Sequence, residues 1–173
     1  MNIRRKIRKH LPDGIYESVL ATLGHSSTLR PDPRVRHDVT RIEVDDRAHI
    51  EVFWKDMEIG KGPALSLFIE NSEVLRFDCF GKDRGHFHVA LFKPRTTEAD
   101  RLYFAEATRI GQIDRAVHEI TRNLPYYQQR NVIRRVREAT IDKGLLAQAA
   151  EMARSKMLGF LESVPALREH VAD

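Results

Sequence analysis

The chain has 173 residues, 42% of them hydrophobic and 31% charged, and a formal net charge of +4. This length and apolar content suffice for one domain with a substantial core, so we expect no second independent domain. No apolar run approaches the roughly 18–20 residues of a membrane span, and no apolar segment follows the basic N-terminus as in a secretory signal. A single cysteine, Cys79, excludes an internal disulfide. These features predict a cytoplasmic protein without a membrane partner, and so small a net charge does not by itself indicate a nucleic-acid partner.

The first elements in chain order are a basic segment, a short helix and a loop. Residues 1–12 form the basic N-terminal segment, with five lysine or arginine residues and no acid. Residues 13–23 have apolar side chains at helical spacing before Gly24, which predicts a capped helix. The prolines within 25–38 exclude a continued helix, so this segment is expected to be a loop.

The apolar period then changes to two, as expected of strands. Residues 39–54 contain two alternating runs separated by Asp45-Asp46-Arg47, which is typical of a hairpin. Further alternating runs follow at 63–70, 73–80 and 86–93. Residues 101–106 suit either a helix or a final strand, and we favour the strand. Short connections between successive strands predict an antiparallel meander of about five strands.

The C-terminal third shows helical periodicity. A first apolar stripe ends at Pro125, a second centres on Val136 and a third spans 146–161, so this part of the chain predicts three helices. Strands followed by helices are the α+β pattern, with the helices packed on the apolar face of the sheet. We therefore expect a single α+β domain over residues 13–164 and a C-terminal tail over residues 165–173.

One face of the predicted sheet collects ionisable side chains. If the hairpin after Asp78 turns symmetrically about Lys82, Asp78 lies opposite His86. Arg76 then lies opposite His88, and these four side chains share the face away from the core. A His-x-His pair in a strand points both imidazoles the same way, about 6.5–7 Å apart at the backbone, which suits two ligands of one metal ion.

Three interpretations of this face remain open. With Asp78 or Glu51, the two histidines have the ligand types of a two-histidine, one-carboxylate metal site. Without a metal, an imidazole beside a carboxylate can act as a general acid or base, and Arg76 can bind a phosphate or carboxylate. The third interpretation, which we favour, is an ordinary solvated face of an antiparallel sheet. No cofactor motif is apparent, and a divalent metal is the cofactor that these residues allow.

Two further groups of basic residues are candidates for contacts with an anion or a nucleic acid. Lys82 and Arg84 lie in a loop with two glycines, whose backbone could approach an anion closely, although the loop lacks the spacing of a P-loop. Arg130, Arg134 and Arg137 fall on one side of a predicted helix, just after two tyrosines. Arginine beside tyrosine suits a surface that contacts phosphates and bases. A hairpin loop and a solvated helix face explain the same residues.

The segment EVLRFDCFGKDRGHFHVALF resembles a motif of uncharacterised bacterial proteins and, more remotely, of the TumE-type toxin–antitoxin family. In that family a strand ending in an aspartate is followed by a short loop and a histidine-rich strand. The matching residues here are Asp78, His86 and His88. The resemblance implies that the polar face of the hairpin matters and that the partner is a nucleic acid or a protein.

Three functional hypotheses follow. We favour a small binding or regulatory protein, not an enzyme, whose basic surface contacts a phosphate-rich or protein partner. The alternative is an RNase-like hydrolase of phosphodiesters, in which His86 and His88 act as bases or metal ligands. In this alternative Asp78 orients the histidines and Arg76 holds the anion. The third hypothesis is a homo-oligomeric interaction protein, in which the helices form the surface of a homodimer.

Overall fold

The computed structural model describes residues 35–89, 101–131 and 133–168. The basic segment and the helix predicted before residue 35 lie outside these residues. The same holds for the end of the predicted tail.

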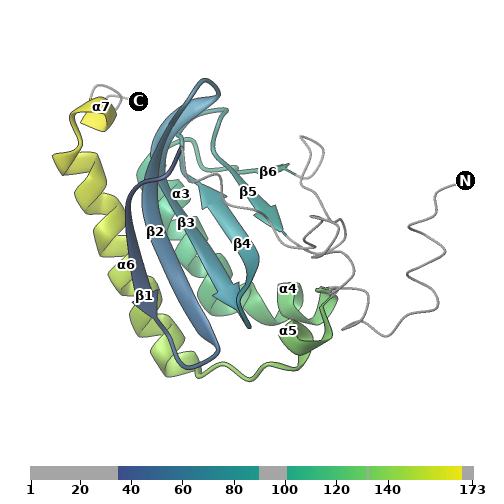
Figure 1. The fold of residues 1–173 in the computed structure, drawn as a ribbon. Helices are drawn as coiled ribbons and strands as arrows, with labels where there is room; N and C mark the ends of the chain where they lie inside the picture. The colour runs from purple at the N-terminus through teal and green to yellow at the C-terminus, as the bar shows by residue number, and fades with distance from the viewer. Residues whose placement is uncertain (1–34, 90–100, 132, 169–173) are drawn as a thin grey trace, which may run out of the picture.

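Six strands form one antiparallel sheet, in chain order from β1 to β6 (Figure 1). The strands are β1 (His37–Glu43), β2 (Ala48–Met57), β3 (Gly60–Ile69), β4 (Ser72–Asp78), β5 (His86–Val89) and β6 (Arg101–Tyr103). The predicted α+β class and antiparallel meander are confirmed. The sheet gains its sixth strand because residues 101–103 are extended and pair with β5, as favoured from the sequence.

Tight turns between the first strands set the register of the sheet. Asp45 Oδ1 accepts hydrogen bonds from the backbone amides of Arg47 and Ala48, at 2.8 and 2.9 Å, and closes the turn between β1 and β2. Glu70 and Asn71 both have positive φ between β3 and β4, as a type I′ turn requires. Register decides which side chains share a face, so these turns position the residues of both faces.

The helical region covers one face of the sheet (Figure 1). Its elements are α3 (Arg109–His118), the π-helical turn η3 (Glu119–Asn123), α4 (Leu124–Arg130), α5 (Arg134–Glu138), α6 (Lys143–Ser163) and α7 (Pro165–Arg168). The predicted end of the first helix at Pro125 is wrong. This proline lies in the first turn of α4, where its missing amide removes no helical hydrogen bond, so the helix continues beyond it. α7, which buries Leu167, lies within the range predicted as a tail.

The hydrophobic core lies between the sheet and the helices. α6 packs against β1, β2 and β3, and α3 packs against α6. Cys79 is part of this core, as expected of a small buried residue. Among the described residues, no helix combines the length and the apolarity that crossing a bilayer requires. The fully buried core side chains include Ile50, Val52, Leu65, Leu67, Phe77, Ala153 and Met157.

Candidate functional site

The hairpin between β4 and β5 brings the predicted site residues together. Asp78 pairs with His86 and Arg76 pairs with His88, so the register predicted from a symmetric turn about Lys82 is confirmed. Paired positions share a face of the sheet, and the helices cover the other face. All four side chains therefore lie on the face opposite to the hydrophobic core.

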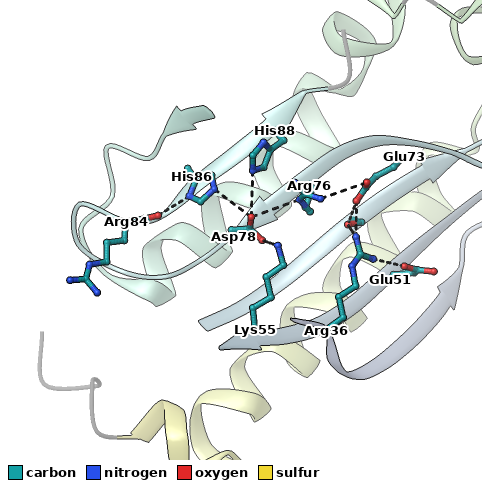
Figure 2. A network of polar contacts seen from close by, with 10 residues as sticks. Arg36, Glu51, Lys55, Glu73, Arg76, Asp78, Arg84, His86 and His88 are labelled. Carbon is teal, nitrogen blue, oxygen red and sulfur yellow. Dashed lines mark hydrogen bonds and ion pairs between the residues drawn. The ribbon is translucent and has the colours of Figure 1, made fainter. Parts of the chain in front are cut away.

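The Asp78 carboxylate is the centre of this cluster (Figure 2). Lys55 Nζ donates a hydrogen bond to Asp78 Oδ1 at 2.6 Å. Asp78 Oδ2 lies 3.5 Å from His86 Nε2, 3.6 Å from His88 Nε2 and 3.8 Å from Arg76 Nε. One ligand atom from the aspartate and one from each histidine all lie within 4.8 Å of one another. We call these five residues the Asp78 cluster.

Lys55 reaches the cluster from β2, although β3 separates it from β4. It pairs with Gly62 of β3, and Ala64 of β3 pairs with Asp78. Strands that flank a common neighbour lie about 9.5 Å apart, so the lysine side chain must cross β3. The small residues at Gly62 and Ala64 leave room for it. Lys55 was not among the site residues predicted from the sequence, although its even spacing from Glu51 places it on the polar face.

The Asp78 cluster is buried, which contradicts the solvated face that we favoured from the sequence. Only 3% of the Asp78 side chain, 5% of the Lys55 side chain and 2% of the His86 side chain are exposed. Ionised groups tolerate such burial only when they are paired and hydrogen-bonded. The cluster is therefore a buried network of paired polar side chains.

One hydrogen bond decides which nitrogen of His86 carries the proton. His86 Nδ1 lies 2.8 Å from the carbonyl oxygen of Arg84. A carbonyl oxygen only accepts, so Nδ1 donates and the neutral ring has its lone pair on Nε2. That lone pair faces Asp78 Oδ2. Two electron-rich atoms that face each other at 3.5 Å attract a cation between them.

The electrostatics keep Asp78 ionised and both histidines neutral. Burial raises the pKa of Asp78, but Lys55, His88 and Arg76 together outweigh burial and hold this pKa well below its usual range. Burial lowers the pKa of His86 and of His88, and the attraction of Asp78 only partly opposes it. Burial also lowers the pKa of Lys55, against the attraction of Asp78. At neutral pH both imidazoles are therefore uncharged, and His86 has its Nε2 lone pair free to bind a metal ion.

A second buried network adjoins the Asp78 cluster on the same face (Figure 2). Arg36 donates to Glu51 Oε2 at 2.8 Å and to Glu73 Oε1 at 3.1 Å, and the Ser66 hydroxyl also donates to Glu73. Arg76 links the two networks, because its guanidinium also lies 3.9 Å from Glu73 Oε2. Glu51 pairs with Arg36 and is not part of the group of potential metal ligands formed by Asp78, His86 and His88, so its role as a ligand stays a prediction. No periodic signal marks Arg36, since it precedes the first strand.

The loop residues Lys82 and Arg84 lie beside the cluster and not within it. Both side chains are exposed. Arg84 contacts the cluster through its carbonyl oxygen, and its side chain points away from Asp78 (Figure 2). The loop thus has a role in orienting His86 that its sequence does not reveal.

The three arginines predicted on one helical side belong to two helices. Arg130 ends α4 and stacks over the Tyr126 ring, with 3.8 Å from its Cζ to the ring centroid. Arg134 and Arg137 lie in α5, where the first pairs with Glu138 and the second donates to the carbonyl of residue 131. The extended backbone at residue 131 separates the two helices, so the predicted common face is wrong. A contact of these arginines with nucleic acid stays a prediction.

The chain matches no protein-family model, no curated protein and no solved structure.

Proposed function

We propose that the protein is a metal-dependent hydrolase of phosphodiesters, in which Asp78, His86 and His88 hold a divalent ion. One observation carries the proposal: the Nε2 atoms of both histidines converge on a single oxygen of an ionised aspartate in a buried site. Two neutral imidazoles and one carboxylate are the ligand set that many divalent transition metals accept.

The distances support this ligand set. The ligand atoms of a tetrahedral zinc ion lie about 3.3 Å apart, because Zn–N and Zn–O bonds are about 2.0–2.1 Å long. The separations of Asp78 Oδ2 from His86 Nε2 and His88 Nε2, 3.5 and 3.6 Å, are close to that value. The outer partner of His86 fits as well, since metal-binding histidines usually donate their other N–H to a carbonyl, as His86 does to Arg84. His88 Nδ1 has no such partner among the described residues. Lys55 fixes the carboxylate through its second oxygen.

The cations of the cluster support an anionic substrate. Lys55 and Arg76 lie beside Asp78 and give the site a positive character that would attract a phosphodiester. Arg76 Nε is buried and makes no hydrogen bond to the described residues, so it can donate to a phosphate oxygen. A bound divalent ion would supply Lewis-acid stabilisation of the charge that develops on the phosphoryl group.

The test is metal content together with hydrolysis. The full chain, purified without affinity-tag histidines or chelator, is expected to bind one Zn²⁺ or Mn²⁺ per chain by elemental analysis. It is expected to hydrolyse bis(4-nitrophenyl) phosphate, and Asp78→Asn or His86→Ala is expected to abolish both properties. His118→Ala, which changes an exposed histidine of α3, is the matched control. A folded protein that binds no metal and has no turnover would refute the proposal.

The burial of the cluster favours a second candidate function. With its side chains almost closed to solvent, the same metal site could stabilise a binding or regulatory protein that performs no turnover. This candidate predicts one bound ion per chain, binding of a phosphate-rich or protein partner and no hydrolysis. The assay above therefore separates the two functions.

A further inference from the structure

A polar cleft of about 550 Å³ lies beside the Asp78 cluster. The turn between β2 and β3, the loop between β4 and β5 and the first residues of α3 form its walls. The cleft is distinct from the cluster, because none of the five cluster residues lines it. Its basic lining residues are Lys61, Lys82, Arg84 and Arg109, against the acidic Glu58 and Asp83.

The walls of the cleft are held in place before any ligand binds. The Gln112 side chain makes two hydrogen bonds to the backbone of Gly81. It accepts one from the amide at 2.9 Å and donates one to the carbonyl oxygen at 3.0 Å. Gly81 has a φ of +86°, a backbone conformation that glycine adopts readily and other residues rarely adopt. Arg109, which lines the cleft, donates hydrogen bonds to the carbonyl oxygens of Lys61 and Leu167 and so links these segments. Because these residues are already ordered, binding of a ligand would cost less conformational entropy.

The cleft and the Asp78 cluster share parts of one loop. Arg84 lines the cleft, while its carbonyl orients His86. The Phe80 ring also lines the cleft and lies edge-on to the His86 ring, with their centroids 5.8 Å apart. A ligand in the cleft would therefore lie next to the site where we propose hydrolysis.

We propose that the cleft binds the phosphate backbone of a single-stranded nucleic acid next to the bond that the Asp78 cluster hydrolyses. The inference rests on the proposed function for the chemistry, while the binding itself is independent of it. Two of the basic lining residues, Lys82 and Arg84, are exposed and can contact successive phosphates, and each such contact releases counterions. The cleft volume is within the range of roughly 300–1,000 Å³ that holds small ligands, and this space suits a single strand better than a duplex.

The experiment is a salt titration of binding. Fluorescence anisotropy of a labelled single-stranded oligonucleotide is measured with the full chain in EDTA, so that turnover plays no part. For wild-type protein we expect log K to fall linearly with log salt concentration. Lys82→Ala and Arg84→Ala are each expected to weaken binding and to reduce this slope by about 0.7, the change for one phosphate contact on a single strand.

Lys143→Ala is the matched control. Lys143 is exposed at the first residue of α6, whereas the cleft lies near α7, beyond the last residue of that helix. A helix of 21 residues is about 30 Å long, so this lysine is remote from the cleft. The control is expected to leave both affinity and slope unchanged.

Two results would contradict the proposal that the cleft binds a nucleic-acid strand. One is an unchanged slope for Lys82→Ala and Arg84→Ala while wild-type protein binds the strand. The other is equal competition by inorganic phosphate or by a mononucleotide, which would indicate a site for a small anion. Loss of hydrolysis with normal strand binding refutes the proposed function alone, so the two failures are distinguishable.

Discussion

At the scale of single residues, the protein depends on a few ionised side chains that are buried in pairs. Among the described residues, Lys55 and Asp78 are the closest ion pair in which both side chains are almost fully buried, at 2.6 Å. Removing one member of such a pair leaves an uncompensated charge in a medium of low polarity. Exposed pairs lack this cost, because water replaces the lost partner.

Lys55→Met is therefore expected to lower the free energy of unfolding by about 3–5 kcal/mol. The control is Lys61→Met, which removes an ion pair with Asp56 whose two side chains are 40% and 38% exposed. The control is expected to cost less than about 1 kcal/mol. Urea unfolding measures both changes, and equal losses in the two variants would contradict the role of Lys55.

A second residue-scale prediction concerns Glu119 in the π-helical turn η3. Tyr127 and Asn123 donate hydrogen bonds to its carboxylate, and Arg115 pairs with it. Burial raises the pKa of Glu119, but these partners outweigh burial and lower this pKa below its ordinary value. A lowered carboxyl pKa contributes stability above the pKa of the unfolded state, about 4.3, and the contribution is lost as the pH falls through the folded pKa.

Glu119→Gln tests this sign. The difference in unfolding free energy between wild type and variant is expected to stay constant above about pH 5 and to shrink as the pH falls below about 4.3. Urea unfolding at several pH values measures it. A difference that grows as the pH falls would show that the carboxylate destabilises the folded protein.

At the scale of elements, the close approach of neighbouring strands decides which residues are tolerated. A Cβ atom at Gly62 in β3 would lie 2.2 Å from the carbonyl oxygen of Cys79, which belongs to the backbone and cannot move alone. Gly159 in α6 has no atom within 4 Å of such a Cβ. The same substitution is therefore expected to have opposite effects in the two elements.

Gly62→Ala is expected to destabilise the protein by about 2 kcal/mol or more, because β3 and the residue after β4 must separate. Gly159→Ala is expected to stabilise it by about 0.5–1 kcal/mol, through the higher helix propensity of alanine. Thermal unfolding of the two variants checks both signs. A stabilising Gly62→Ala would show that β3 does not need this glycine.

At the scale of the whole molecule, the inner strands β2 to β5 are mostly buried on both faces, with an apolar core on one and paired charges on the other. The ligand atoms of the Asp78 cluster come from two strands that only the folded chain brings together. A metal ion that binds the folded state alone must therefore stabilise the whole fold. The homodimer expected from the helices stays a prediction.

Zn²⁺ at a free concentration of 100 times Kd is expected to stabilise wild-type protein by about 2.7 kcal/mol, which corresponds to roughly 5–10 °C in Tm. EDTA is expected to reverse the shift. His88→Ala is expected to show none, while the control His118→Ala keeps it. Equal shifts in wild type and His88→Ala would place the ion elsewhere.

The strands, their antiparallel order and the register of the β4–β5 hairpin could all be predicted from local patterns of residues. Period two and short connections are local signals, and a symmetric turn between Asp78 and His86 leaves one pairing. The same local signals place His88 and Arg76 on the face of Asp78, as the pairing of β4 with β5 confirms. Local patterns failed at Pro125, because the π-helical turn before it lets the helix continue.

The burial of the polar face, and the distant side chains that complete its networks, depend on how the strands are arranged in space and could not be predicted from local patterns. Lys55 crosses β3, and Arg36 reaches Glu73 from a segment 37 residues away. Such contacts depend on which strands are neighbours and on how small the intervening side chains are, and neither has a periodic signal in the sequence. Burial in turn affects the protonation of all three potential ligands. It lowers the pKa of His86 and His88, whereas the neighbours of Asp78 outweigh burial and lower the pKa of this carboxyl.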